Sequence, residues 1–261
     1  MDNFNVYKDI QARTKGEIYI GVVGPVRTGK STFIKRFMEL AVLPAMEDES
    51  LKAVSTDELP QSAGGKTVMT TEPKFIPKEA VQITLGDGIQ AKVRLIDCVG
   101  YMVDGAAGHV ENGEERMVKT PWSEKEIPFT QAAQIGTRKV IGDHSTIGIV
   151  VTTDGSVGEL KRSAYIDAEK QTVDELKKLG KPFILLLNST KPYSDETLKL
   201  AEQLAADYGV TVLPVSCEQL KKEDIFHILE SVLKEFPVTQ LDFHIPKWLE
   251  VLPATHWLKT Q

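Results

Sequence analysis

The run GPVRTGKS, residues 24–31, combines glycines, a lysine and a hydroxyl at the spacing that holds phosphate groups. Glycine lets the backbone curl so that successive amide groups point inward around phosphate oxygens. The run lies between an apolar stretch and a helical pattern, so a helix N-terminus adds partial positive charge there. We predict a nucleotide-binding loop whose contacts are Gly24, Arg27, Thr28, Gly29, Lys30, Ser31 and Thr32.

Within this loop, Lys30 is expected to reach the β- and γ-phosphates as a point charge, and the Ser31 hydroxyl to bind Mg²⁺. The second predicted Mg²⁺ ligand is an acid, Asp97, which follows the apolar stretch 93–96 and begins the pattern DCVG. An acid at the end of such a strand commonly holds Mg²⁺ through water. Gly100, three residues later, lets a backbone amide approach the γ-phosphate. The alternative role for Asp97 is to cap a turn.

Between these motifs lies the run TVMTTEP, residues 67–73, in which Thr70 and Thr71 are the candidate hydroxyls. A nucleotide switch needs a hydroxyl here to complete the metal shell and to sense the γ-phosphate. The predicted catalytic set is therefore Lys30, Thr70, Thr71 and Asp97, and the predicted metal ligands are Ser31, Thr71 and Asp97. The pattern leaves open which of the two threonines contacts the metal.

The order of these motifs resembles the GTPase-like branch of phosphate-loop proteins, which read guanine with the pattern N-K-x-D. This chain has Asn188-Ser189-Thr190-Lys191 after the apolar stretch 183–187. A carboxylate accepts two hydrogen bonds from guanine, whereas the ammonium of Lys191 can only donate. Unpaired donors cost about 1–3 kcal/mol each, so we expect ATP rather than GTP, with Asn188 and Lys191 near the base.

The position after DCVG, where many such switches carry a water-orienting glutamine, is Tyr101. Hydrolysis is then slow, or another group acts from residues 98–128 or from a neighbouring subunit. Arg27 and Lys66 are candidates to neutralise charge in the transition state, with solvated surface cations as the plainer alternative. His109 and His144 lack the spacing of a metal site and are interpreted as structural.

These residues need a scaffold in which strands and helices alternate. Strands are predicted at 18–23, 81–85, 92–96, 146–152, 183–187 and 210–215, and helices at 30–43, 130–141, 164–179, 195–208 and 224–236. The pattern predicts an α/β fold with three α/β/α layers around a mostly parallel sheet. A Gly86-Asp87-Gly88 turn adds one antiparallel edge strand. Residues 44–74 and 98–128 show no regular period and are expected to be functional or mobile loops.

Composition limits the class of protein. The 261 residues carry a net charge of −6, which argues against a nucleic-acid partner because phosphate binding needs a basic surface. Two cysteines cannot form a disulfide framework, and neither a signal peptide nor a membrane helix is evident. We expect a cytoplasmic protein with one nucleotidase domain over residues 1–240 and a tail over 241–261.

Several stretches resemble the stage IV sporulation protein A family, ATPases that build the basal layer of the bacterial spore coat. The resemblance covers nearly the whole chain and is carried by residues 24–33, 57–63, 66–75, 97–101, 137–141 and 144–155. It implies a phosphate-loop ATPase of the translation-factor-related class that polymerises after hydrolysis. By motif position, Lys30 matches the nucleotide-binding lysine, Asp97 the metal-side acid, and Thr70 and Thr71 the hydrolysis-sensing threonines.

The resemblance also implies partners and a location. Members of this family associate with themselves and with other spore coat proteins on the mother-cell side of the forespore surface. A C-terminal region beyond the part matched here binds a small membrane-associated peptide, so this chain is expected to correspond to the nucleotidase domain alone. Two alternatives stay open, a nucleotide-bound structural scaffold with incidental hydrolysis and a GTP-dependent switch.

Overall fold

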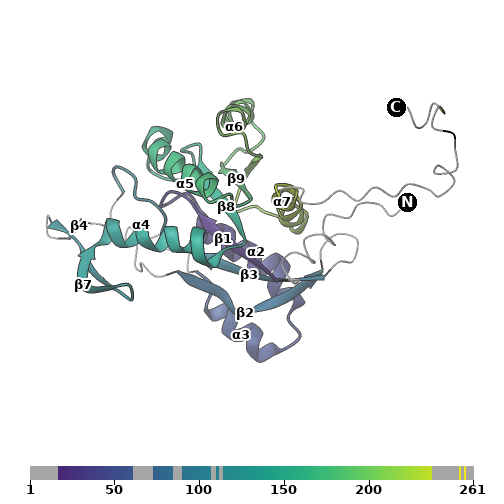
Figure 1. The fold of residues 1–261 in the computed structure, drawn as a ribbon, viewed down its shortest axis with the longest axis horizontal. Coiled ribbons are helices and arrows are strands. Elements are labelled where there is room, and N and C mark those ends of the chain that lie inside the picture. The colour runs from purple at the N-terminus through teal and green to yellow at the C-terminus, as the bar shows by residue number, and fades with distance from the viewer. Residues whose placement is uncertain are drawn as a thin grey trace.

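The computed structural model describes residues 17–60, 73–84, 90–106, 110–111 and 114–236, together with Pro253 and His256. In this part of the chain, one sheet has the strand order β10-β9-β8-β1-β3-β2 (Figure 1). Neighbouring strands are parallel except β2 and β3. The predicted sheet is therefore confirmed. Its strands are β1 (Glu17–Val23), β2 (Lys74–Thr84), β3 (Gln90–Asp97), β8 (Ile147–Thr153), β9 (Phe183–Asn188) and β10 (Val212–Val215).

Helices cover both faces of this sheet. One apolar cluster joins the strands to α2 (Lys30–Phe37) and α7 (Lys222–Lys234). A second cluster joins them to α5 (Ile166–Lys178) and α6 (Asp195–Tyr208), and to the π-helical turn Val140–His144 that continues α4 (Phe129–Lys139). The two clusters are separate, as alternate residues of a strand point to opposite faces. The three-layer α/β/α prediction is confirmed.

The central strands explain the position of the core. Strands β8 and β9 are buried at every position, which fits their continuous apolar runs, because a parallel strand covered on both faces cannot expose polar side chains. The edge strand β2 instead contains both buried and exposed residues. The carboxyl ends of β1, β3, β8 and β9 therefore meet at one rigid edge, where ligands bind in such sheets.

Helix boundaries follow local chemistry. The helix α6 spans the predicted residues, with the Ser194 hydroxyl accepting from the Thr197 amide at 3.3 Å and Gly209 ending it in the left-handed conformation. Elsewhere the expected helices change type at one end. Helix α2 continues as a π-helical turn, Met38–Val42, and the predicted start of α5 is a 3₁₀ turn, Arg162–Tyr165.

The structure corrects the prediction that residues 44–74 and 98–128 lack regular elements. Helix α3 (Glu49–Asp57) lies beside β2, and the Asp48 carboxylate caps it by accepting from the Ser50 amide at 2.8 Å. Only Ser55 of α3 is buried, so no apolar period marked the helix. Two short hairpins occupy the second stretch, β4 (Val110–Glu111) with β5 (Glu114–Glu115) and β6 (Met117–Thr120) with β7 (Ser123–Pro128).

Some predictions fall outside the described residues. The turn Gly86-Asp87-Gly88 does so, although β2 and β3 pair on either side of it, with Thr84 opposite Gln90. The predicted domain boundary at residue 240 and most of the tail also do so. No helix within the described ranges is long and apolar enough to cross a bilayer.

Candidate functional site

The loop between β1 and α2 has the curled backbone that the motif predicts. Three of its residues have positive φ, namely Gly24, Arg27 and Gly29, and among the described residues Arg27 is the sole one other than glycine to do so. A Cβ at Gly29 would lie 2.3 Å from the Asn188 Nδ2 atom, so a side chain has no room there. The backbone of this loop is therefore held in a tight curl, the kind of conformation from which amides can surround an anion.

The Lys30 side chain lies inside the loop. Its Nζ donates to the Pro25 carbonyl oxygen at 2.6 Å and to the Gly24 carbonyl oxygen at 3.4 Å, and the side chain is buried. Burial lowers the pKa of Lys30, while the neighbouring Cys98 and Asp97 oppose that shift. The lysine is thus positioned at the centre of the loop, where a phosphate needs a cation.

Two of the residues expected to contact the nucleotide, Thr28 and Asn188, form side-chain hydrogen bonds to other protein groups. The Thr28 hydroxyl donates to the Pro25 carbonyl oxygen at 3.0 Å. The Asn188 side chain donates to the Thr28 carbonyl oxygen at 2.9 Å and accepts from the Cys217 amide at 3.0 Å, and it is almost fully buried. Asn188, the last residue of β9, therefore connects the phosphate loop to the segment that follows β10. Lys191 is exposed, with its backbone amide donating to the Ser189 hydroxyl at 3.0 Å.

Asp97 ends β3 directly beside β1, where it pairs in register with Val22. One of its carboxylate oxygens, Oδ1, is buried and has no hydrogen-bond partner in the described part of the chain. Burial raises the pKa of this carboxyl to about 6, while Lys30, the Cys98 amide and the Ser31 hydroxyl act in the opposite direction. An acceptor of this kind beside a hydroxyl fits a divalent metal and its water shell.

The described residues contain no group of three or more His, Cys, Asp and Glu side chains able to hold a metal unaided. A cation at Asp97 and Ser31 would therefore depend on ligand oxygens, as Mg²⁺ does in phosphate-transfer sites. Thr70, Thr71 and Lys66 lie outside the described residues, as does His109. His144 packs edge-on against the Phe75 ring, with centroids 5.4 Å apart, in keeping with a structural role.

The segment after Asp97 lies against the phosphate loop. The Tyr101 amide donates to the Gly24 carbonyl oxygen at 3.2 Å, and the Val26 amide donates to the Tyr101 carbonyl oxygen at 2.9 Å. A Cβ at Gly100 would lie 2.1 Å from the Gly24 oxygen and 2.7 Å from the Lys30 Nζ, so only glycine fits. The motifs around Lys30 and Asp97, separate in sequence, therefore form one site.

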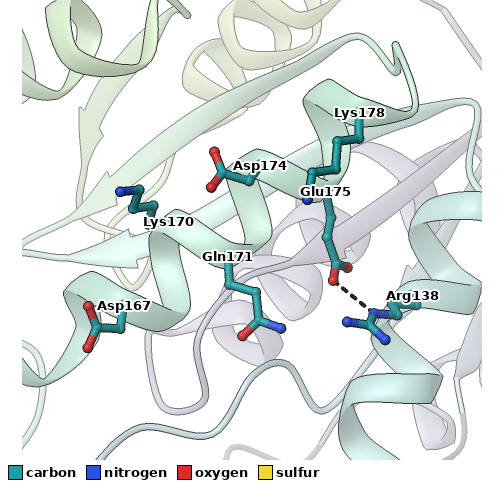
Figure 2. A pocket seen from close by; sticks show the side chains of 7 residues that line it. All are labelled: Arg138, Asp167, Lys170, Gln171, Asp174, Glu175 and Lys178. Atoms are coloured by element: carbon teal, nitrogen blue, oxygen red, sulfur yellow. Dashed lines mark hydrogen bonds and ion pairs between the residues drawn. The ribbon is translucent and has the colours of Figure 1, made fainter.

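Sequence reasoning missed two residues that contact this segment. The Tyr101 hydroxyl donates to the Glu175 carboxylate, which also accepts from Arg138 Nε at 2.8 Å. Figure 2 shows Glu175 of α5 and Arg138 of α4 facing one another. Glu175 lies 74 residues from Tyr101, and no spacing rule links them. A cavity of about 330 Å³ lies beside this pair, and Arg138, Asp167, Lys170, Gln171, Asp174, Glu175 and Lys178 line it.

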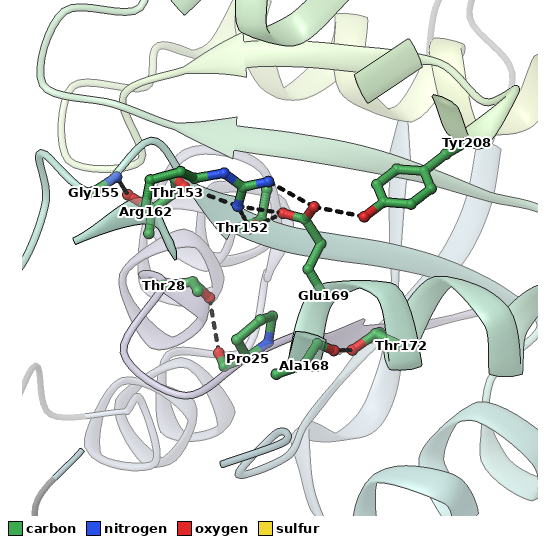
Figure 3. A network of polar contacts seen from close by, with 10 residues as sticks. All are labelled: Pro25, Thr28, Thr152, Thr153, Gly155, Arg162, Ala168, Glu169, Thr172 and Tyr208. Carbon is green, nitrogen blue, oxygen red and sulfur yellow. Dashed lines mark hydrogen bonds and ion pairs between the residues drawn. The ribbon is translucent and has the colours of Figure 1, made fainter. Parts of the chain in front are cut away.

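A second polar network lies at the carboxyl end of β8 (Figure 3). Arg162 donates to both Glu169 oxygens, at 2.6 and 2.7 Å, and the Tyr208 hydroxyl donates to Glu169 at 2.8 Å. The Thr152 hydroxyl also bonds to this carboxylate, which is completely buried. The network joins β8, α5 and α6 behind the phosphate loop.

Comparison with known proteins identifies similar chains. The family model described as "Stage IV sporulation protein A, ATPase domain" matches residues 1–237. Stage IV sporulation protein A of Bacillus subtilis (strain 168) is 51% identical over 259 residues, which cover 99% of this chain and 53% of that protein. The protein of that name from Clostridioides difficile (strain 630) is 52% identical over 258 residues, covering 99% and 52%. The chain spans about half the length of the curated relatives it matches.

Proposed function

We propose that this chain, which belongs to the stage IV sporulation protein A ATPase-domain family, binds ATP with Mg²⁺ and hydrolyses it to ADP and phosphate. The observation that carries this proposal is the convergence of three groups at one edge of the sheet. These are the curled backbone of residues 24–31, the buried Lys30 amine and the unpartnered Asp97 oxygen beside Ser31. Together they match the charge pattern of a triphosphate and its metal.

Each of these groups has a defined task in the proposed reaction. The loop amides hold the phosphates, and Lys30 exchanges its bonds with the Pro25 and Gly24 carbonyls for bonds with phosphate oxygens. Ser31 and Asp97 would hold Mg²⁺, the latter through water, and Thr70 or Thr71 would complete the shell. When bound, Mg²⁺ neutralises the charge that develops on the phosphate oxygens.

The choice of ATP rests on the segment after β9. Asn188 occupies the position from which such proteins fasten the loop, but the fourth position is the cationic Lys191 rather than an acid. A cation cannot accept hydrogen bonds from guanine, so GTP loses the contacts that would distinguish it. Because Lys191 is exposed, it is able to approach a ligand from the solvent side.

At the level of the cell, we propose that hydrolysis changes the shape of the domain and permits self-association into the basal layer of the spore coat. The support for this step is the name of the relatives, which are sporulation proteins. The proposed partners are further copies of the chain, other coat proteins and, through regions outside this chain, a small membrane-associated peptide. The proposed location is the cytoplasmic, mother-cell side of the forespore surface.

Lys30→Ala tests the nucleotide site directly. We expect ATP affinity, measured by titration with a fluorescent ATP analogue and Mg²⁺, to fall at least about tenfold, because charge-assisted bonds to phosphate are lost. Lys35→Ala is the matched control, since Lys35 lies on the same helix with a half-exposed side chain paired to Glu39 at 3.9 Å. Unchanged affinity in Lys30→Ala would disprove the site.

Two further measurements separate the alternatives. Thr70→Ala combined with Thr71→Ala should preserve ATP binding while abolishing turnover and ordered assembly. Normal assembly by this variant would favour a scaffold in which hydrolysis is incidental. Competition between ATP and GTP for the fluorescent analogue tests the base, and tighter binding of GTP would favour the GTP-dependent switch.

A further inference from the structure

Tyr101 occupies the place where a glutamine would orient the attacking water, yet its side chain turns into the protein. It is 1% exposed and packs with Val26, Val103, Tyr165 and Ala168. A side chain buried in this way cannot contact a water at the phosphates. Any effect of Tyr101 on hydrolysis is therefore transmitted through the backbone that it anchors.

We propose that Tyr101, Glu175 and Arg138 form a positioning chain that holds residues 97–101 against the phosphate loop in the geometry required for hydrolysis. This inference rests on the proposed function, because it concerns the rate of the same ATP reaction. None of the three is a catalytic residue. Each acts through the position of Gly100 and Asp97, which lie next to Lys30 and Ser31.

The first link is the backbone of Tyr101. Its amide and carbonyl both bond to the phosphate loop, at Gly24 and Val26, and form a short parallel bridge. Gly100 is so close to the Gly24 oxygen that even one added carbon would clash. A small shift of Tyr101 therefore moves Gly100 relative to the loop, and with it the amide expected near the γ-phosphate.

The second link is the Tyr101 hydroxyl. It donates to Glu175, and the carboxylate is held from its other oxygen by Arg138 Nε at 2.8 Å. With each oxygen bound to a different partner, the carboxylate cannot rotate without breaking a bond. Burial and Glu175 both raise the pKa of Tyr101, so its hydroxyl stays protonated and continues to donate at neutral pH.

The third link shows why the chain acts on rate more than on stability. The Arg138 side chain is 59% exposed, whereas the Glu175 side chain is 14% exposed. Because the cation of this ion pair is largely in water, the Arg138–Glu175 pair contributes little to the free energy of unfolding. Misplacement of reacting groups by about 1 Å, in contrast, can lower a rate about a hundredfold. The pair is therefore suited to fix an orientation.

Tyr101→Phe is the principal test, made in the purified 261-residue chain. We expect kcat for ATP hydrolysis to fall about tenfold while the affinity for the ATP analogue changes less than twofold. Tyr165→Phe is the matched control, because Tyr165 lies in the same apolar cluster and, within the described residues, its buried hydroxyl has no hydrogen-bond partner. Its kcat should remain within twofold of wild type.

The other members of the chain give a second, independent readout. Glu175→Ala should lower kcat as much as Tyr101→Phe, and the double variant should be no slower than Glu175→Ala, because both changes break one connection. Arg138→Lys retains a cation and should keep more turnover than Arg138→Ala. Additive losses in the double variant would show that the residues do not act as a chain.

Hydrogen exchange separates positioning from general destabilisation. Tyr101→Phe should accelerate exchange at the Val26 and Tyr101 amides, which bond across the segment, without accelerating exchange in β8 and β9. The inference is overturned if Tyr101→Phe keeps wild-type kcat or raises it, or if its exchange increases uniformly. Failure of the proposed function looks different, since wild type itself would then not hydrolyse ATP.

Discussion

Two glutamates on one helix, Glu169 and Glu175 of α5, each bind one arginine and one tyrosine but in opposite surroundings. Glu169 is completely buried, and its partner Arg162 is 19% exposed. Glu175 is held by Arg138, which is 59% exposed. Figure 3 shows Glu169 between Arg162 and Tyr208, and Figure 2 shows Glu175 with Arg138. The same residue types thus stabilise the core in one place and, as proposed, position residues 97–101 in the other.

The difference follows from what each group connects. The Glu169 network joins β8, α5 and α6, which are already packed in the core, so its bonds are protected from water. The Glu175 pair connects α5 and α4 to a loop segment beside the phosphate site. Because its arginine is largely in water, this open pair contributes little to the free energy of unfolding, whereas removing one partner of the enclosed pair is costly.

Breaking the enclosed network should have the largest effect. Glu169→Ala leaves the Arg162 charge and the Tyr208 hydroxyl without their acceptor, and we expect the free energy of unfolding to fall by about 3–5 kcal/mol. Urea unfolding followed by circular dichroism measures this loss. Glu202→Ala, at an exposed position of α6, is the control and should change stability by less than about 0.5 kcal/mol. A loss below about 1 kcal/mol for Glu169→Ala would contradict the comparison.

Breaking the open pair should cost less. Glu175→Ala leaves Arg138 in water, so the main penalty is the Tyr101 hydroxyl without an acceptor, on the order of 1–2 kcal/mol. The same urea experiment checks it. If Glu175→Ala proved as destabilising as Glu169→Ala, the two networks would not differ in kind.

Alkaline pH should weaken both networks through their tyrosines. Burial, together with a glutamate, raises the pKa of Tyr101 and of Tyr208 above the usual value. Their contribution to stability is fully present below about pH 10, and it falls as pH rises beyond that, because the unfolded chain loses these protons first. Tyr208→Phe and Tyr101→Phe should each flatten this fall by at most about 1.4 kcal/mol per pH unit. Urea midpoints across the alkaline range measure the slope, and identical slopes in wild type and both variants would refute the prediction.

The smallest effect on stability should come from Arg138→Ala. Since this side chain is largely in water, we expect a change of no more than about 1 kcal/mol in the free energy of unfolding. Thermal unfolding should show a shift of about 2–4 °C at most. A larger shift would place Arg138 with the enclosed network.

Local sequence patterns were sufficient to predict which residues and strands lie at this edge of the sheet. The run around Lys30, the acid at Asp97 and the apolar strands β8 and β9 each carry their signal within a few residues. The structure accordingly has them at the expected edge of the sheet. Helix α3 was not predicted, although Asp48 caps it, because the helix buries almost no side chains and so shows no apolar period.

Contacts between distant residues could not be predicted in this way. Tyr101 was interpreted only as the absence of a glutamine, and neither Glu175 nor Arg138 stands out among the charged residues of its helix. Asn188 was expected near the base because of its motif, whereas its two bonds to the phosphate loop and to Cys217 depend on how β9 and β10 are stacked. Such roles depend on tertiary packing and cannot be predicted from the spacing of residues in the sequence.

The Asn188 amide has a mechanical consequence. Because one side chain bonds to the Thr28 carbonyl and to the Cys217 amide at once, the end of β9 connects the phosphate loop directly to the segment after β10. If a nucleotide binds here as proposed, a base that fits poorly among those segments would shift the phosphate-loop backbone that contacts its phosphates. Discrimination between nucleotides would then affect the rate of hydrolysis as well as the binding affinity.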